Sequence, residues 1–88
     1  MHLSFTEAGW NEYFDWETED PKTIKRINIL IKDIEREGYR GVGKPEPLKG
    51  EYRGWWSRRI DEKNRIVYRL QGKDTVEIAH CKGHYGDH

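Results

Sequence analysis

The segment from Asp20 to Gly38, DPKTIKRINILIKDIEREG, constrains the fold of this chain more than any other. Its apolar side chains recur every three or four residues, which is the spacing of one helix face: Ile24, Ile27, Ile31 and Ile34, with Leu30 alongside. Asp20 is a good N-cap, Pro21 suits the first helical position, and Gly38 favours a helix end. The segment therefore predicts a long amphipathic helix.

Short apolar runs on both sides of this helix complete the predicted fold. Residues 2–5 alternate and indicate a strand, and a helix is expected over about residues 7–17, with Ser4 or Thr6 as its N-cap. A loop rich in glycine and proline spans 38–50. Strand-like runs follow at about 52–60, 64–70 and 75–81, joined by short polar separators. The order β-α-α-β-β-β predicts an α+β fold with two N-terminal helices on a small antiparallel sheet, in a single domain over residues 1–88.

The composition indicates the cellular compartment in which the protein is expected to work. No stretch approaches the roughly 20 apolar residues of a membrane span, and no signal segment opens the chain. The one cysteine, Cys81, excludes an internal disulfide framework and is expected to be a small buried residue. We therefore expect a cytoplasmic protein with no membrane partner.

The formal charge is zero overall but unevenly distributed. Residues 1–37 carry nine acidic and five basic side chains, whereas residues 38–88 carry eleven basic and seven acidic ones, giving −4 and +4. The second half could face a polyanion. Two solvated surfaces that differ in charge would give the same pattern.

Two motifs resemble known sites but fail on inspection. The run from Gly38 to Lys44 matches a phosphate loop, yet Pro45 stands where a serine or threonine should bind magnesium. The C-terminal region offers possible zinc ligands: His80, Cys81, His84 and His88. His80 and Cys81 are neighbours on a predicted strand and should point to opposite faces, so we expect no metal site. We also expect no cofactor.

A different set of polar groups suits the cleavage of RNA. Glu46 lies between Pro45 and Pro47, whose fixed φ angles would hold its carboxylate rigidly. Basic strand residues and a histidine complete the set: Arg58, Arg59, Arg65 and His84. A base, cations and an acid are what attack by a 2′-hydroxyl on its own phosphate requires, and this reaction needs no metal.

Each of these residues also has an ordinary interpretation. Glu46 could be a surface carboxylate, the arginines could cross-link strands, and His84 could lie in a tail without a role. Trp55 and Trp56 should point to opposite faces, one into the core and the other over a helix or a stacked base. Tyr85 could stack on a base or cap the chain end.

Three longer stretches point to a family. GKPEPLKG, WWSRRIDEKNRIVYRL and CKGHY resemble the YoeB-type (Txe/YoeB) toxins of bacterial toxin–antitoxin pairs, within the RelE-like superfamily, and the resemblance covers essentially the whole chain. It implies an endonuclease that depends on the ribosome, cleaves messenger RNA in the decoding site and inhibits translation. It also implies the same β-α-α-β-β-β fold.

The resemblance implies a role for each candidate residue. Glu46 corresponds to the general base, Arg65 to the group that stabilises the phosphate, and His84 to the general acid, with Tyr85 holding or stacking the substrate. The basic residues expected to contact RNA are Lys49, Arg58 and Arg59.

The expected partners follow from the same family. They are mRNA on the ribosome, an antitoxin of the YefM/Phd type, operator DNA bound only as the toxin–antitoxin complex, and a second copy of the chain in a homodimer. Two features depart from the family pattern: Gly86, Asp87 and His88 continue past the His–Tyr pair, and the chain is neutral where relatives tend to be basic. A non-cleaving module that binds ribosome or antitoxin, and a ribosome-independent RNase, remain the alternatives.

Overall fold

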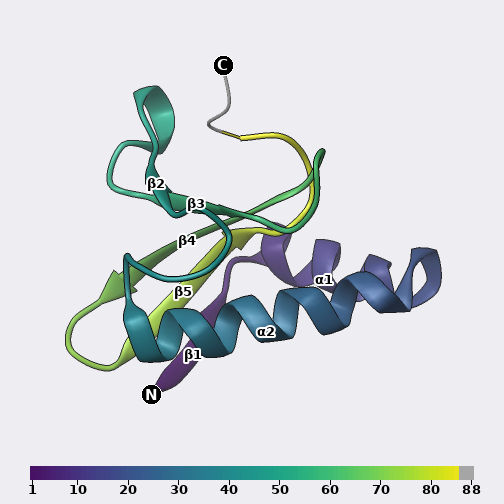
Figure 1. Ribbon diagram of the computed structural model, residues 1–88, viewed down its shortest axis with the longest axis horizontal. Coiled ribbons are helices and arrows are strands. Elements are labelled where there is room, and N and C mark those ends of the chain that lie inside the picture. Colours follow the sequence, from purple (N-terminus) through teal and green to yellow (C-terminus); the bar gives the residue numbers. More distant parts are fainter. Residues whose placement is uncertain (86–88) are drawn as a thin grey trace.

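A five-stranded sheet forms the centre of the protein, and both helices pack on one of its faces (Figure 1). The computed structural model describes residues 1–85. The strands are β1 (His2–Phe5), β2 (Glu46–Pro47), β3 (Trp56–Arg59), β4 (Arg65–Gln71) and β5 (Thr75–His80). They lie in the order β1-β5-β4-β3-β2. The predicted fold of two helices packed on a small sheet is confirmed, and four of its five strands pair antiparallel as expected.

The sheet differs from the prediction in three details. β1 pairs in parallel with β5, whereas every other pair is antiparallel. β2 lies inside the segment predicted as loop. The run expected as one strand over 52–60 contains the end of a 3-10 turn, η1 (Gly50–Tyr52), and then the short β3. Gly54 has a φ of +96° between them, which interrupts the extended conformation.

The two helices begin and end where capping residues allow. α1 (Glu7–Glu19) is capped by Thr6, whose hydroxyl accepts from the Gly9 N–H at 3.0 Å, so Thr6 rather than Ser4 is the N-cap. α2 (Pro21–Glu37) begins after Asp20, whose carboxylate accepts from the Lys22 N–H. α2 ends at Gly38 with a φ of +68°, as predicted from the sequence.

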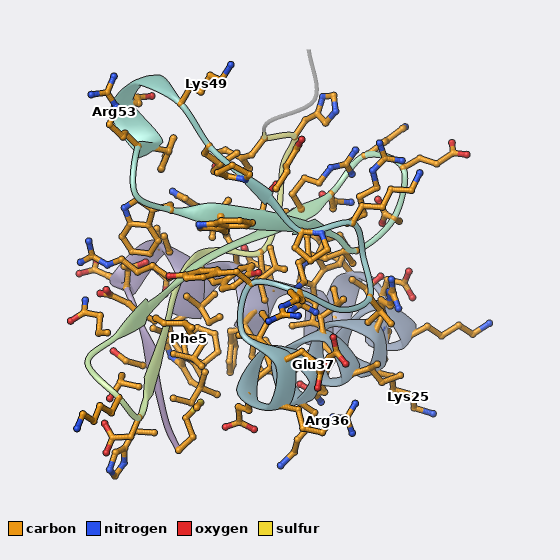
Figure 2. All side chains as sticks on the ribbon, turned by 60° about the vertical axis from the view of Figure 1, so that its left-hand side comes forward. Phe5, Lys25, Arg36, Glu37, Lys49 and Arg53 are labelled. Atoms are coloured by element: carbon orange, nitrogen blue, oxygen red, sulfur yellow. The ribbon has the colours of Figure 1, made fainter. Side chains whose placement is uncertain are left out.

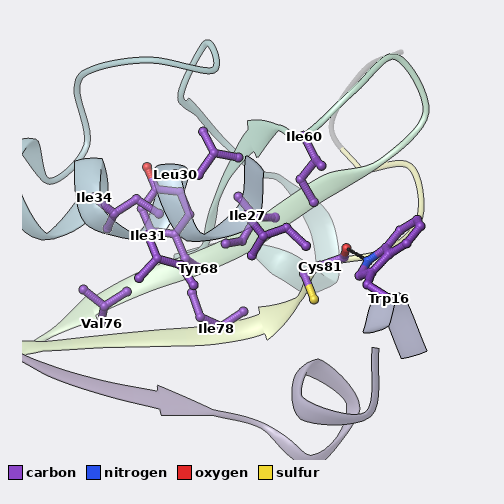
Figure 3. Packing of buried hydrophobic residues seen from close by; sticks show 11 residues of the cluster. Trp16, Ile27, Leu30, Ile31, Ile34, Ile60, Tyr68, Val76, Ile78 and Cys81 are labelled. Atoms are coloured by element: carbon purple, nitrogen blue, oxygen red, sulfur yellow. Dashed lines mark hydrogen bonds between the residues drawn. The ribbon is translucent and has the colours of Figure 1, made fainter. Parts of the chain in front are cut away.

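The main core lies between the helices and the sheet (Figure 3). The isoleucine face of α2 packs on inward-facing residues of β4 and β5, and Trp16 of α1 closes one end. The Trp16 indole N–H donates to the Cys81 carbonyl at 2.9 Å, so the ring is both packed and hydrogen-bonded. Cys81 is buried in this core, as expected.

The opposite face of the sheet, which we call the open face, carries a second and smaller cluster. Leu48, Val67 and Ala79 are buried there, with three aromatic rings packed around them: Tyr52, Trp55 and Tyr85. Trp56 packs against the helix-side core instead, so the prediction that the two tryptophans point to opposite faces is confirmed. Within residues 1–85, no helix is long and apolar enough to cross a membrane.

Candidate active site

Glu46 is placed on the open face by strand pairing. Glu46 lies opposite Ser57, Ser57 opposite Val67, and Val67 opposite His80, which makes one row across four strands. Residues opposite each other in neighbouring strands project from the same face. Because Val67 belongs to the open-face cluster, Glu46 shares that face.

The segment that carries Glu46 is tied to the sheet on both sides. The Arg59 N–H donates to the Gly43 carbonyl at 2.7 Å, and the Leu48 N–H donates to the Trp55 carbonyl at 2.9 Å. Leu48 is buried in the open-face cluster and anchors the strand, while Pro45 and Pro47 restrict the backbone around Glu46. The backbone that carries the half-buried Glu46 is thus held in one place.

A pocket of about 660 Å³ lies beside this segment, and we call it the Glu46 pocket. Residues 46–52, His84 and Tyr85 line it. Four of the seven predicted site residues therefore meet in one place: Glu46, Lys49, His84 and Tyr85. Lys49 and Arg53 project from the η1 turn, at the other end of the molecule from Arg36 and Glu37 of α2 (Figure 2). The pocket lining thus combines two carboxylates, an imidazole, two phenols and a lysine.

Tyr85 is held in a fixed orientation by neighbouring rings. It stacks on His80 with centroids 5.1 Å apart and planes 20° apart, and it meets Tyr52 edge-on at 5.4 Å. Burial is the main cause that raises the pKa of Tyr85 to about 12, with Tyr52 and Glu12 adding to it. The phenol is therefore protonated near neutral pH and can donate a hydrogen bond.

The turn after β5 brings His84 next to the start of β4. The Arg65 N–H donates to the Gly83 carbonyl at 2.8 Å, and the Gly83 N–H donates to the Asn64 side-chain oxygen at 2.9 Å. His84 itself is exposed. The backbone is thus fixed against the β3–β4 hairpin at Gly83, two residues before Tyr85.

Arg65 lies close to this turn but does not line the Glu46 pocket. Only 2% of the residue is exposed, and its Nη1 donates to the Asp61 carbonyl at 2.6 Å and the Asn64 carbonyl at 3.1 Å. Arg59 pairs with Arg65 across the strands, so it lies on the same face, and it is exposed. The roles predicted for these two arginines stay predictions.

The prediction that Arg58 contacts RNA is wrong for this structure, because Arg58 is 0% exposed. All five N–H donors of its guanidinium have acceptors inside the protein. Nε donates to the Tyr68 hydroxyl at 3.1 Å, and Nη1 donates to Asp33 Oδ2 at 2.5 Å and to the Val42 carbonyl at 3.0 Å. Nη2 donates to the carbonyls of Gly38 and Arg40. Arg58 holds α2, the following loop and the sheet together.

Asp33, the partner of Arg58, was absent from the sequence prediction. It lies on the buried side of α2, among leucine and isoleucine residues, and it also accepts from the Val42 N–H at 3.0 Å. The hydrogen bond from Arg58 is the largest of the causes that lower the pKa of Asp33 to about 2. A charged residue at helical spacing on an apolar face was the sign by which sequence reasoning could have found it.

Three further residues beside the pocket had no sign in the sequence. Tyr52 lines the pocket, and His80 and Glu12 are linked to it by hydrogen bonds. Their positions in the chain are far apart, so only the folded structure brings them together. In the sequence, His80 figured only as a possible zinc ligand.

The possible zinc ligands do not converge within the described residues. His80 contacts Tyr52 and Tyr85, whereas Cys81 points into the helix-side core, as expected for neighbours on a strand. No group of three or more histidine, cysteine, aspartate or glutamate side chains arranged to hold a metal occurs in residues 1–85. His88, and the extension formed by Gly86, Asp87 and His88, lie outside the described residues.

Known proteins resemble the chain over nearly its full length. Residues 5–85 match the family described as YoeB-like toxins of bacterial type II toxin–antitoxin systems. Toxin YoeB of Streptomyces coelicolor is 49% identical over 85 residues, which cover 97% of this chain and 100% of the relative. Toxin YoeB of Escherichia coli K12 is 46% identical with the same coverage.

Solved structures agree with these relatives. A YoeB/ParE toxin from Agrobacterium tumefaciens superposes with a TM-score of 0.92 at 42% identity, covering 97% of this chain and 100% of that one. A YoeB dimer from Staphylococcus aureus gives 0.89 at 38% identity. A heterotetrameric YoeB–YefM toxin–antitoxin complex from the same species gives 0.88 at 38% identity. Both cover 97% of this chain and 98% of the other.

Proposed function

Because the chain belongs to the family of YoeB-like toxins of bacterial type II toxin–antitoxin systems, we propose that it is an endoribonuclease. It cuts messenger RNA in the decoding site of the ribosome and thereby stops translation. The observation that supports this most strongly is the Glu46 pocket, where a carboxylate and an imidazole share one cavity with a lysine and a tyrosine.

The proposed reaction uses the RNA's own hydroxyl as nucleophile. Glu46 removes the proton of a 2′-hydroxyl, and the 2′-oxygen attacks the adjacent phosphorus. His84 donates a proton to the leaving 5′-oxygen as its bond to phosphorus breaks. The products are a 2′,3′-cyclic phosphate and a free 5′-hydroxyl, so the protons balance and no metal is required.

The remaining residues of the site bind and orient the substrate. Arg65 neutralises the crowded phosphate in the transition state, and Lys49 and Arg59 contact the RNA backbone. Tyr85, with its fixed ring, holds or stacks a nucleotide.

Dependence on the ribosome fits a pocket that holds only part of its machinery in place. His84 lines the pocket and is exposed, whereas Arg65 is buried and does not line it, so the reacting groups are not all gathered in the pocket. Placing the reacting groups in line can supply about 7–11 kcal/mol of a reaction barrier. A message held rigidly in the decoding site supplies that alignment, which free RNA lacks.

The proposed partners extend from the relatives. A YoeB of Staphylococcus aureus has been solved as a dimer and as a complex with YefM. We extend this to the present chain: an antitoxin of the YefM/Phd type neutralises it, two copies can form a homodimer, and operator DNA is bound only by toxin and antitoxin together. The site of action is the cytoplasm, where ribosomes translate.

Primer extension on programmed ribosomes tests the proposal. The unchanged protein should cut ribosome-bound message, and Glu46→Gln or His84→Gln should each lower the rate by about 10²- to 10⁴-fold, as expected for a lost base or acid. Glu51→Gln is the matched control, because Glu51 lines the same pocket and the proposed reaction gives it no role.

Three outcomes would contradict the proposal. If the protein binds ribosomes and antitoxin but never cuts RNA, it is the non-cleaving module. Equal cutting of free and ribosome-bound RNA indicates a general RNase. Full activity of both pocket variants places the chemistry elsewhere in the chain.

A further inference from the structure

A chain of hydrogen bonds leads from helix α1 to the Glu46 pocket through His80. One oxygen of Glu12, Oε1, accepts from the Cys81 N–H at 2.8 Å, and the other, Oε2, lies 3.1 Å from Nδ1 of His80. Nε2 of His80 lies 3.0 Å from the hydroxyl of Tyr52. The carboxylate and the imidazole are both mostly buried, with side chains 22% and 19% exposed. This series of hydrogen bonds thus ends on the Tyr52 phenol, which lines the pocket.

The topology explains how a residue of α1 reaches this side of the sheet. β1 pairs with β5 only as far as Phe5 opposite Ile78, so the last residues of β5 have a free edge. α1 lies along that edge, where the Thr6 hydroxyl donates to the Ala79 carbonyl at 2.8 Å. The Glu12 side chain can therefore bond to the end of β5.

The hydrogen-bond partners fix which nitrogen of His80 carries the proton. An ionised carboxylate only accepts hydrogen bonds, so Nδ1 must donate to Glu12. In the neutral ring Nε2 then has a lone pair, and the Tyr52 O–H must donate to it. The Tyr52 oxygen can then accept a further hydrogen bond next to the Glu46 pocket, where the Tyr85 hydroxyl also lies within its reach.

The Tyr52 ring is also held in place. It meets the His80 ring edge-on at 5.7 Å and the Tyr85 ring edge-on at 5.4 Å. It is half-buried in the open-face cluster with Trp55. Both the position and the direction of the hydroxyl are thereby set before any ligand arrives, which is the requirement for a specific polar contact.

We propose that Glu12 and His80 form a positioning dyad that presents the Tyr52 oxygen to the Glu46 pocket as a hydrogen-bond acceptor for the RNA. The proposal rests on the proposed endoribonuclease function. An acceptor does not bind a phosphate, which itself only accepts. Tyr52 therefore recognises a donor of the nucleoside, either a ribose hydroxyl or a base N–H.

The dyad can be tested without RNA by NMR of the imidazole nitrogens in the purified protein at pH 8. His80 should carry its proton on Nδ1, with Nε2 bare. In Glu12→Gln the amide oxygen keeps the bond from the Cys81 N–H, so the amide NH₂ faces Nδ1. The proton of His80 should then move to Nε2, while Glu17→Gln, an exposed change on the same helix, leaves it on Nδ1.

The effect on RNA is tested by single-turnover cleavage on programmed ribosomes. Tyr52→Phe keeps the ring and removes the oxygen, so the rate constant divided by the half-saturating concentration should fall about 3- to 10-fold, the worth of one hydrogen bond. Glu12→Gln alone should give a similar loss. Adding Glu12→Gln to Tyr52→Phe should give no further loss, because Glu12 acts through the Tyr52 oxygen.

The two tests separate the possible failures. A proton on Nε2 in the unchanged protein overturns the dyad. Independent losses from Glu12→Gln and Tyr52→Phe show that Glu12 acts on the fold alone, which also overturns the proposal. If the unchanged protein does not cleave, the endoribonuclease function falls and with it the role of Tyr52 toward RNA, while the NMR result still decides the dyad.

Discussion

Arg58 connects three parts of the molecule through one side chain. Its guanidinium bonds to Asp33 of α2, to Tyr68 of β4, and to backbone carbonyls of the loop that follows α2. The cation is fully buried, and Asp33 supplies its counter-charge. Removing one partner of a buried pair leaves the other charge without compensation, which typically costs about 3–5 kcal/mol.

The first stability prediction concerns this pair. Asp33→Asn should lower the free energy of unfolding by about 3 kcal/mol, because a neutral amide cannot balance the buried guanidinium. Urea unfolding measures this, with Asp15→Asn as the control, since Asp15 is exposed on α1. Equal stability of the two variants would show that the pair contributes nothing.

The Asp33–Arg58 pair also predicts how the stability of the protein changes at acid pH. The Arg58 hydrogen bond lowers the pKa of Asp33 from 3.8 to about 2 in the folded protein. A depressed folded pKa means that the stabilisation is complete above the unfolded pKa and is lost as the pH falls toward the folded one. Between about pH 4 and 2, Asp33→Asn should therefore lose stability less steeply than the unchanged protein. Parallel urea midpoints across this range would contradict the assignment.

At the residue level, strand alternation and short motifs could predict a face but not a partner. Arg58 and Arg59 look alike in the sequence, and only the presence of Asp33, 25 positions earlier, separates a buried cross-link from an exposed cation. Glu46, Lys49, His84 and Tyr85, which line one pocket, could be singled out because their motifs are local, and their roles stay predictions. The bonds among Glu12, Tyr52 and His80 depend on long-range contacts, which one sequence does not reveal.

The loop between α2 and β2 is shaped by glycines that pass close to this buried pair. Gly41 has a φ of +113°, and a Cβ there would lie 2.0 Å from Asp33 Oδ2. Gly54, with a φ of +96°, has a similar backbone but no atom within 4 Å of such a Cβ. The two positions share the conformational cost of a side chain, and only Gly41 adds a collision.

Gly41→Ala should therefore destabilise the protein by about 2 kcal/mol more than Gly54→Ala, the range for a forced fit inside a packed region. For a domain of this size, that difference corresponds to a melting temperature lower by roughly 8–16 °C. Thermal unfolding of the two variants compares them directly. Equal melting temperatures would mean that the loop moves away from Asp33 at little cost.

Helices and strands were predictable where apolar residues recur periodically and capping residues mark the ends of the element. α2 was predicted with both of its ends, because its isoleucines, Asp20, Pro21 and Gly38 agree. β2 was not predicted, since a two-residue strand has no periodicity and forms only because Leu48 is anchored in the open-face cluster. The parallel pairing of β1 depends on which edge of the hairpins is free, and a local pattern does not contain that information.

The two halves of the chain, which differ in net charge, supply different elements of the fold. The segment of residues 1–37, with a net charge of −4, supplies both helices, while residues 38–88, with +4, supply the sheet from β2 to β5 and the lining of the Glu46 pocket. The basic half thus faces the RNA in the proposed function, although the chain as a whole is neutral. This division was predictable from the charge counts, but the location of the pocket required the fold.

The central claim is that the Glu46 pocket cuts RNA by attack of a 2′-hydroxyl, and one substrate change tests it most directly. After the cut is mapped, a message with a single 2′-deoxynucleotide on the 5′ side of that bond is loaded on ribosomes beside the all-ribose message. We predict that the all-ribose message is cut, leaving a 2′,3′-cyclic phosphate, and that the deoxy message stays intact, because the nucleophile is missing. Cleavage of both messages at the same rate would contradict the mechanism and the roles given to Glu46 and His84.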